Sequence, residues 1–434
     1  MKKSIGAVAL VSLMIFTFSS SAHGAGFLIY EHGAAAMAMG GAFIGLANDV
    51  SAIFHNPAGV AWLEGTQISA GTTLIFPSTT LTLDNWPDPS YQTIDMESNM
   101  YYPSTFYISH KFSDKIVGGF GFFNPYGLGA EWPDPENFPL RYLSTKSDMK
   151  TFFFNPMIAF KLNDNLSIGF GVSYIYAMLE IDLVYSLDLT DPIYFPIQGY
   201  YDVPITLDNT TGSAWGLNAG ALYKGDKFSF GFNWRGGFDI DYAGDLTLDM
   251  SAVPIALPEN GTAETVFSFP HIFGIGAAFN LSEQFTLTAD IHYILWSCFE
   301  TIVVDADVPG LPMDLDFPEI EENWEDSFVF RFGAQYKPNE SLSLRAGFLY
   351  DQTPQPIESM DPMLPDANRW ALTLGFGYNT GKMAIDLAYQ YEPFQDRTSP
   401  NREIPPYQVG PINLGEGTYS TTAHLFGISF IFKF

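Results

Sequence analysis

One stretch of eight residues decides the fold of this chain: Phe228-Ser229-Phe230-Gly231-Phe232-Asn233-Trp234-Arg235. Its even positions are all aromatic, and its odd positions are small or polar, with Arg235 at the end. Successive side chains of a β-strand point to opposite faces, so the stretch is a strand with one aromatic face and one small or polar face. The same alternation runs through residues 370–379 and 383–392.

These alternating runs are longer than the strands of most soluble sheets. They last about ten residues, whereas a typical strand in a soluble domain has about 5–6. About ten residues is the length at which a tilted strand crosses a bilayer. No run of 18 or more apolar residues follows position 24, which excludes a helical membrane protein. We therefore expect the bulky face to meet lipid and the small or polar face to line the interior.

The whole chain follows this pattern and predicts an all-β fold, a 14-stranded antiparallel transmembrane β-barrel. Six connections have two or three residues, and they alternate with long connections rich in Pro, Asp and Asn. Short periplasmic turns and long external loops are typical of outer-membrane barrels, and an even strand number places both chain ends in the periplasm. The predicted strands are residues 66–83, 100–113, 115–130, 149–162, 166–187, 213–224, 227–249, 265–281, 284–306, 326–338, 341–352, 367–380, 382–392 and 421–434.

The first 24 residues have the pattern of a secretory signal peptide. Lys2 and Lys3 form a positive start, an apolar stretch covers residues 5–18, and small residues precede a cut before Ala25. The alternative is an N-terminal membrane anchor, but the stretch is short for a span. Export followed by barrel insertion predicts the outer membrane of a Gram-negative bacterium.

Composition limits the function classes. With 16% aromatic and 47% hydrophobic residues, the chain is not disordered. Its single cysteine, Cys298, has no partner for an intrachain disulfide. A net charge of -29, from 19 basic and 48 acidic residues, repels a polyanion, so nucleic acid is excluded as a partner.

Residues 25–65 lack the strand pattern and are expected to fill the lumen. Gly33, Gly40 and Gly41 stand among several alanines, and small residues allow close packing in a confined space. A disordered periplasmic arm is the alternative, but Phe27 and Phe43 belong to an apolar set that argues against disorder. The expected organisation is a signal peptide over 1–24, an N-terminal hatch, or plug, over 25–65 and a barrel over 66–434.

The last strand ends on Phe434, and Phe430 and Phe432 share its face. A terminal aromatic on an amphipathic strand resembles the signal that the outer-membrane assembly machinery reads. The expected surroundings are outer-membrane lipid and lipopolysaccharide, and we expect a monomer.

The chain resembles the FadL family of outer-membrane transporters for long-chain fatty acids and other hydrophobic compounds over essentially all of residues 25–434. The resemblance rests on an ordered set of short motifs. These are Ala25-Gly26-Phe27, the Gly/Ala stretch, Asn56-Pro57-Ala58, Tyr126-Gly127-Leu128, Gly220-Ala221-Leu222-Tyr223, Leu295-Trp296-Ser297, Tyr350-Asp351-Gln352-Thr353-Pro354 and Leu364-Pro365-Asp366 with Arg369-Trp370. The resemblance implies a fourteen-stranded barrel plugged by an N-terminal hatch.

The resemblance also implies an inner binding site at the start of the hatch. Phe27 is the residue that matches the family's pocket-lining position, with Leu28 beside it. Asn56, Pro57 and Ala58 would hold the hatch geometry. The ligand implied is a hydrophobic small molecule.

A break in the third predicted strand supplies a candidate exit. Phe123-Asn124-Pro125-Tyr126-Gly127 places proline and glycine inside a strand, which marks a bulge or kink. In a closed barrel such a kink opens a local gap, and in the family it gives a lateral opening toward the bilayer. A passive bulge is the alternative.

The long connection after this strand supplies a candidate capture loop. Trp132, Phe138, Leu140, Tyr142 and Leu143 lie there among prolines and acids. They form either an interfacial aromatic belt or a ligand groove. The resemblance favours the groove, because external loops form the family's first, weaker site.

One departure from the family concerns the ligand's head group. Met178 and Glu325 stand where fatty-acid transporters of the family place basic residues. Arg235, Arg331 and Arg345 remain as possible carboxylate partners. The alternative is that they pair with interior acids such as Asp290 and Asp386. A fatty acid and a neutral hydrocarbon or aromatic compound both remain open as the substrate.

The sequence shows no sign of an enzyme. None of its histidines has metal-ligand spacing, and no G-x-S-x-G motif is present. We therefore expect no metal and no cofactor. The alternatives to hydrophobic-compound transport are a general diffusion porin and a structural or adhesin barrel.

Overall fold

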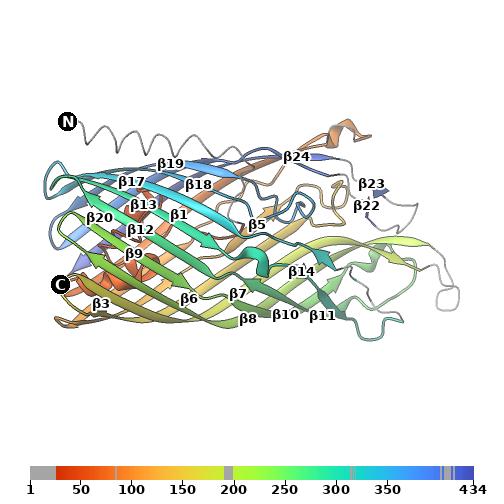
Figure 1. Ribbon diagram of the computed structural model, residues 1–434. Helices are drawn as coiled ribbons and strands as arrows, with labels where there is room; N and C mark the ends of the chain where they lie inside the picture. Colours follow the sequence, from red (N-terminus) through yellow and green to blue (C-terminus); the bar gives the residue numbers. More distant parts are fainter. Residues whose placement is uncertain are drawn as a thin grey trace.

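The computed structural model describes residues 26–83, 86–189, 199–312, 315, 317, 319–400, 403–404, 412–413 and 416–434. Its main sheet closes on itself, because β1 (Thr66–Thr82) pairs antiparallel with both β3 (Ser104–Ser113) and β24 (Gly417–Lys433). Closure leaves the wall without sheet edges. The predicted fourteen-stranded antiparallel barrel is confirmed, and Figure 1 shows its strands tilted around one long axis.

The strands follow chain order around the barrel, and four of them are interrupted. Between β3 and β24 the wall consists of β4 (Ile116–Phe123) with β5 (Gly127–Glu131), β6 (Lys146–Lys161), β7 (Leu166–Asp188), β8 (Tyr200–Lys224), β9 (Phe228–Arg235) with β10 (Phe238–Leu248), β11 (Asn260–Phe269) with β12 (Ile272–Asn280), β13 (Phe285–Ile294) with β15 (Val304–Asp307), β17 (Ser327–Tyr336), β18 (Leu342–Asp351), β19 (Arg369–Asn379) and β20 (Met383–Pro393). Shorter elements are β2 (Thr93–Asp95), β14 (Thr301–Ile302), β16 (Ile320–Glu321), β21 (Arg397–Ser399), β22 (Glu403–Ile404), β23 (Ile412–Asn413), η2 (Pro89–Tyr91), η3 (Met250–Ala252) and η4 (Trp296–Cys298).

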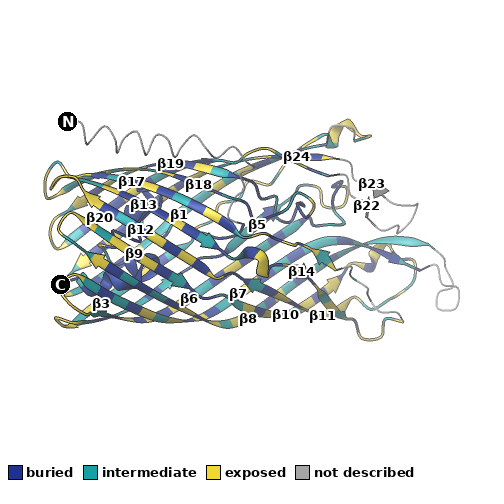
Figure 2. Ribbon diagram, viewed as in Figure 1, coloured by how far each residue is buried: buried dark blue, intermediate teal, exposed yellow. Residues whose placement is uncertain are grey.

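The two faces of the wall are the ones that the alternation predicts. In β9 the rings of Phe228, Phe230 and Phe232 are exposed, whereas Gly231 and Arg235 are buried. Figure 2 shows the same alternation of exposed and buried positions along the other strands. The hydrophobic side chains that are exposed in the isolated chain are therefore the lipid-facing surface of a membrane barrel.

The strand boundaries differ from the prediction in two ways. β8 begins at Tyr200 rather than at residue 213, and it continues the pairing with β7 beyond Pro204, which sits opposite Val184. Pro204 has no N–H for a ladder, which favoured a loop here, but Val203, Ile205 and Leu207 alternate with less buried residues and are buried where β8 pairs with β7. Two further breaks lie between β9 and β10, at Gly236–Gly237, and between β11 and β12, at Pro270–His271. Glycine pairs and proline weaken a strand ladder.

Residues 26–65 lie inside the barrel, toward the end that also carries the C-terminus (Figure 1). We refer to residues 26–65 as the hatch; its short helices are α2 (Ala34–Met37), α3 (Ala52–His55) and η1 (Pro57–Trp62). Backbone N–H groups of the hatch donate to side chains of the wall: Ala34 to Ser429 at 2.9 Å, Gly40 to Thr373 at 3.0 Å and Ile44 to Asp290 at 2.7 Å. Within the described residues, no helix is long and apolar enough to cross a membrane.

Inward-facing glycines let the hatch backbone approach the wall. A Cβ built on Gly347 in β18 would lie 2.2 Å from the Gly40 nitrogen, and one on Gly45 of the hatch 2.6 Å from the Ala277 backbone in β12. These neighbours are backbone atoms, so they have no flexible side chain to move aside. Glycine at these points is a condition for the close contact between hatch and wall.

Replacing Gly347 with valine is expected to displace the hatch, because overpacking of this kind costs about 1–3 kcal/mol. The measurement is protease sensitivity of the hatch in the purified, folded barrel, which should rise relative to the unsubstituted protein. Ala346→Val is the matched control, since Ala346 is the exposed neighbour on the outward face. Equal protease sensitivity of the two variants would contradict the close packing.

Candidate functional site

The centre of the candidate site is the side chain of Phe27, which is only 4% exposed. Five aromatic rings from four separate parts of the wall surround it, and we call this set the aromatic cage. The ring centroids lie 6.2 Å from Phe27 for Tyr126, 5.7 Å for Phe269, 4.7 Å for Trp296, 5.6 Å for Phe299 and 5.4 Å for Trp324. Most of these contacts are edge-to-face, the geometry that aromatic quadrupoles prefer. Phe27 thus fills an apolar site in the lumen.

The backbone around Phe27 pairs with the interrupted third strand. Leu28 forms an antiparallel bridge with Tyr126. The Ile29 N–H donates to the Pro125 carbonyl at 2.8 Å, and the Gly127 N–H donates to the Phe27 carbonyl at 3.0 Å. The start of the hatch therefore acts as a short extra strand against the break between β4 and β5.

The break itself is a real interruption of the wall. Pairing between β3 and β4 runs only as far as Phe106 and Phe122, and β5 pairs with β6 alone. The Asn124 side chain bridges the gap, since its Oδ1 accepts from the Ser104 N–H at 3.1 Å and its Nδ2 donates to the Thr151 carbonyl at 2.6 Å. A side chain and the hatch together replace the missing ladder, as buried backbone groups require. Residues 124–126 are called the kink below.

Tyr101, in the loop before β3, lies beside the same gap. It forms a bridge with Ile75 of β1. A Cβ on Gly129 of β5 would lie 2.2 Å from the Tyr101 ring, so the ring rests directly on this glycine. A ring on the loop before β3 thus covers the gap beside the kink.

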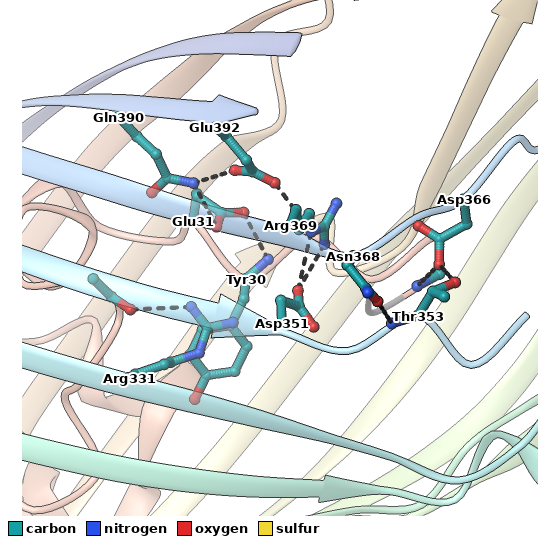
Figure 3. A network of polar contacts seen from close by, with 12 residues as sticks. Tyr30, Glu31, Arg331, Asp351, Thr353, Asp366, Asn368, Arg369, Gln390 and Glu392 are labelled. Carbon is teal, nitrogen blue, oxygen red and sulfur yellow. Dashed lines mark hydrogen bonds and ion pairs between the residues drawn. The ribbon is translucent and has the colours of Figure 1, made fainter. Parts of the chain in front are cut away.

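A buried carboxylate holds the first described residue of the hatch. The Gly26 N–H donates to Asp366 Oδ2 at 3.1 Å, and the Thr353 hydroxyl donates to the same oxygen. Asp366 lies in the connection between β18 and β19, and burial raises the pKa of its carboxyl while Arg369, Thr353 and the Gly26 N–H oppose that shift. Figure 3 shows Asp366 and Thr353 together at one end of a larger polar network.

The rest of this network surrounds Arg369. Its guanidinium makes ion pairs of 3.0 Å with Asp351 and 3.0 Å with Glu392. Gln390 links Glu392 to Glu31 of the hatch, with a 3.3 Å hydrogen bond to Glu31. Figure 3 shows these side chains converging from neighbouring strands on the start of the hatch. The acids Glu31, Asp351, Asp366 and Glu392 all surround Arg369, so this part of the lumen does not favour an anion.

Asn56, Pro57 and Ala58 lie toward the other end of the hatch. Asn56 Nδ2 donates to the Ile44 carbonyl at 3.0 Å and to the Ala221 carbonyl of β8 at 3.1 Å. Its Oδ1 accepts from the Ala58 N–H at 3.1 Å and caps η1, with Pro57 as the first residue of that helix. Asparagine thus joins two hatch segments to the wall.

The three lumen-facing arginines have different environments. Arg345 pairs with Asp386 at 2.6 Å, which confirms that expected ion pair. Arg331 donates to the Gly40 carbonyl at 3.1 Å and lies 4.2 Å from the Tyr30 ring centroid, while Asp290 instead accepts from the hatch backbone. Arg235 donates to the Phe54 carbonyl at 3.2 Å.

The structure does not bring Met178 and Glu325 into the cage. Met178 is 43% exposed on the outward face of β7, between the buried residues Ala177 and Leu179. Glu325 is exposed as well, although it follows Trp324 of the cage. Strand alternation explains the placement of Met178, because matching it to the family with an error of one position moves the side chain to the other face of the strand.

The loop aromatics pack on one another and on residues of β1, β2 and β24. Trp132, Phe138 and Leu140 are buried in a small apolar cluster, where the Trp132 and Phe138 rings stack 5.1 Å apart. Tyr142 and Leu143 are half-buried at its margin. We call this set the loop cluster. A cavity of about 400 Å³ beside Trp132 is polar, and its lining includes Glu131 among other charged side chains.

A second apolar cluster extends from the cage into the long hairpins. This cluster begins at Phe27 and the cage. It continues along the interior faces of the strands from β7 to β15 and reaches the ends of their hairpins. Its outer members include Leu187, Val203, Leu248, Met250, Val253 and Val308. The loop cluster is separate from it. The sequence analysis missed this connection, because it treated residues 200–212 as a loop.

The sequence analysis also missed most of the cage. The rings not predicted come from the ends of strands: Phe269 is the last residue of β11, Phe299 lies between β13 and β15, and Trp324 lies just before β17. The only sequence signal for these cage residues was an aromatic residue next to a break or an end of a predicted strand. Nothing in the local sequence shows that these rings meet, because they come from positions far apart in the chain.

A closed transmembrane barrel with aromatic outward faces defines the class: this is an outer-membrane β-barrel protein of a Gram-negative bacterium, as predicted. A family model described as "Outer membrane protein transport protein (OMPP1/FadL/TodX)" matches residues 15–434, and the chain belongs to this family. The family is one of transport proteins, not enzymes.

Similar proteins carry two kinds of names. A long-chain fatty acid transport protein of Salmonella typhi is 23% identical over 461 residues, covering 100% of both chains. A solved Pseudomonas aeruginosa FadL homologue has a TM-score of 0.77 and 20% identity, covering 94% of this chain and 100% of that one. The P. putida toluene transporter TodX has a TM-score of 0.73 and 17% identity, covering 95% and 99%.

Replacing Asp366 with alanine is expected to loosen the start of the hatch. A hydrogen bond to a charged group contributes about 1.5–3 kcal/mol, so amide exchange in a peptide covering residues 26–31 should rise by about ten- to hundredfold. Hydrogen–deuterium exchange measures this directly. Asp396→Ala is the control, because Asp396 is an exposed acid nearby in the chain. Unchanged exchange in the Asp366 variant would show that the carboxylate does not hold this segment.

Proposed function

We propose that this protein transports hydrophobic compounds, either long-chain fatty acids or hydrocarbons, across the outer membrane. The observation that carries the proposal is Phe27, an apolar side chain of the chain's own N-terminal segment, seated in a cage of five aromatic rings. The names of similar proteins support the same substrate class, since they include fatty-acid and toluene transporters. In this proposal Phe27 holds the place that the apolar part of a ligand takes.

The proposed exit is sideways, through the kink in strand three. The segment that carries Phe27 is also the one that pairs with Pro125 and Gly127. A ligand that displaces Phe27 from the cage therefore also removes backbone partners of the kink. The gap between strands two and three would then open beside Tyr101, and the ligand would enter lipid without crossing water.

The proposed entry begins at the external loops. The loop cluster around Trp132 remains the predicted capture site, and it packs against Leu81 of β1 and Tyr419 of β24, where the wall meets the loops. The second apolar cluster, which runs from the cage to the ends of the long hairpins, offers another apolar path that leads to the cage without interruption. A ligand that inserts between the hairpins would reach Phe27 along apolar side chains, because each step exchanges one apolar contact for another.

The division into signal peptide, hatch and barrel is part of the same proposal. Residues 1–24 lie outside the described residues. Hydrogen bonds from the hatch to strands all around the wall support its role as a plug. Phe434, exposed at the end of the chain, is the proposed contact with the assembly machinery, and the protein is proposed to act as a monomer in outer-membrane lipid and lipopolysaccharide.

Deleting residues 25–65 separates this proposal from a general diffusion porin. The deletion is expected to raise conductance in planar bilayers at least severalfold, since the lumen of fourteen strands is too wide for strand side chains to fill. The control is the intact protein, reconstituted in the same way. Equal conductance of both would mean that the hatch does not block the lumen.

Locking the hatch to the kink tests the exit route. Leu28 and Tyr126 form a bridge pair, and opposite residues of antiparallel strands lie about 4.5–5.5 Å apart, within the range of a disulfide. The double variant Leu28→Cys with Tyr126→Cys, in a Cys298→Ser background, is expected to lose uptake of oleate or toluene when oxidised. Reduction should restore it at least tenfold.

The two single-cysteine variants serve as controls: whatever rate of uptake each one has, oxidant should not change it. Normal uptake by the oxidised, fully cross-linked double variant would disprove release through movement of this segment. Absence of uptake in the unmodified protein as well would favour a structural or adhesin barrel.

A further inference from the structure

The lysines of this acidic chain gather at one end of the barrel. Eight of the ten lysines that follow residue 24 lie at the end with the short turns, which also carries the C-terminus (Figure 1). The other two, Lys146 and Lys150, lie in β6 toward the long loops, where they pair with Glu180 and Asp148. In an outer-membrane barrel the short turns face the periplasm. The excess of lysine therefore belongs to the periplasmic end.

Three of these eight lysines have partners within the protein. Lys111 forms ion pairs of 2.9 Å with Glu64 and 3.2 Å with Asp114. The ammonium groups of Lys161 and Lys224 lie 4.5 Å and 5.2 Å from the ring centroid of Trp62, at the end of η1.

The other five have no ion pair, ammonium hydrogen bond or cation–π contact with any residue that the structure describes. We call these five the lysine rim: Lys115, Lys227, Lys337, Lys382 and Lys433.

The lysine rim extends around the barrel instead of forming one patch. Its members come from the turns β3–β4, β8–β9, β17–β18 and β19–β20 and from the end of β24. Two of them are direct neighbours, since the Lys433 N–H donates to the Lys382 carbonyl at 2.8 Å. A membrane meets a barrel on all sides, whereas a soluble partner covers one side. The distribution therefore favours lipid as the partner of the rim.

The rim lies at the depth of lipid head groups. Exposed aromatic side chains at membrane–water interfaces mark this depth. Three rim lysines are direct sequence neighbours of exposed aromatic residues of the outer face: Lys227 of Phe228, Lys337 of Tyr336 and Lys433 of Phe432. A lysine stem can lie along apolar surface while its ammonium group reaches polar surroundings. The ammonium groups can therefore reach the phosphates beside these rings.

Acids of the same end do not neutralise the rim. All six are exposed, and in the described part of the chain none lies within ion-pair distance of a rim lysine. These acids are Glu64, Asp114, Asp164, Asp226, Glu283 and Glu340. Water and salt screen exposed charges that are not in contact. The acceptor for the rim must therefore come from outside the chain.

We propose that the lysine rim binds the phosphate groups of anionic phospholipids in the periplasmic leaflet of the outer membrane. An ammonium group has three N–H donors for phosphate oxygens. Attraction to an anionic lipid surface contributes about fivefold in affinity for each lysine near it. The loop end offers no equivalent site, because Lys146 and Lys150 already have acids. The inference does not rest on transport, and it assigns this end of the barrel a preference among lipids.

The test compares two spin-labelled lipids with the same acyl chains, phosphatidylglycerol and phosphatidylcholine. The purified full-length protein is reconstituted in phosphatidylcholine vesicles, and electron paramagnetic resonance gives the association constant of each lipid with the barrel. Phosphatidylglycerol is expected to associate about twofold or more strongly, because only one end of the barrel attracts it. Raising the salt concentration should reduce this ratio toward one.

The exposed part of the rim supplies the variants. Replacing Lys115, Lys227, Lys337 and Lys382 together with glutamine should lower the ratio to about one, whereas replacing the same four with arginine should preserve it, since each charge remains. The double variant Lys227→Gln with Lys337→Gln should give an intermediate ratio. Its matched control is Lys146→Gln with Lys150→Gln, which removes two charges at the loop end and should leave the ratio unchanged. Heat-modifiable mobility in SDS gels identifies the folded variants that are compared.

A ratio of one in the unsubstituted protein would overturn the proposal. Equal ratios in the glutamine and arginine variants would do the same, since charge at the rim would then have no effect. Loss of the preference in millimolar glycerol 3-phosphate, but not in sodium chloride of equal ionic strength, would assign the rim to soluble phosphates and also overturn it. Uptake of oleate or toluene is not part of the readout, so the result is independent of the proposed transport function.

Discussion

The structure depends on one constraint: every backbone N–H and C=O group inside a membrane barrel must have a hydrogen-bond partner within the protein. Most of the wall satisfies it with strand ladders. In strand three the chain leaves the ladder with strand two after Phe122, and Pro125 has no N–H to donate. Asn124 and the first residues of the hatch supply the missing partners, so the stability of the wall at this point depends on the plug.

This dependence links the wall to the aromatic cage. The segment that completes the kink also carries Phe27 into the aromatic cage, and Asp366 holds its first described residue. An apolar ligand that competes for the cage therefore competes with the contacts that keep the kink closed. No separate signalling element is required between the two, because they share three consecutive residues of the hatch.

The lumen is polar along β18, β19 and β20 and apolar beside the kink. Arg345 pairs with Asp386, Arg369 pairs with Asp351 and Glu392, and Gln390 links Glu392 to Glu31 of the hatch. On the opposite side Arg235 lies among Phe54, Phe123 and Phe153. Burial of a charge in such a setting is unfavourable unless another interaction compensates for it. The distribution of partners, rather than the number of arginines, distinguishes these sites.

Much of this protein could be predicted from period two alone. The residues of β9 alternate so regularly that their lipid-facing and interior faces follow without a structure, and proline with glycine at 125 and 127 predicts the kink. The long hairpin beginning at Tyr200 carries the same alternation at Val203, Ile205 and Leu207, but Pro204 within it suits a loop equally well, and only the pairing with β7 decides between the two. The breaks at Gly236–Gly237 and Pro270–His271 were visible but ambiguous, since glycine and proline also occur at bulges.

The sequence by itself determined the barrel, its strand number, the faces of its strands and the position of the kink, because these depend on local alternation and on single residues with restricted backbones. Only the tertiary structure decided which side chains meet. The cage gathers rings from residues 126, 269, 296, 299 and 324, and Arg235 lacks an acid that Arg345 has, although both occupy the same interior face. Such differences arise from the closure of the barrel around the hatch, which brings together positions that no local pattern relates.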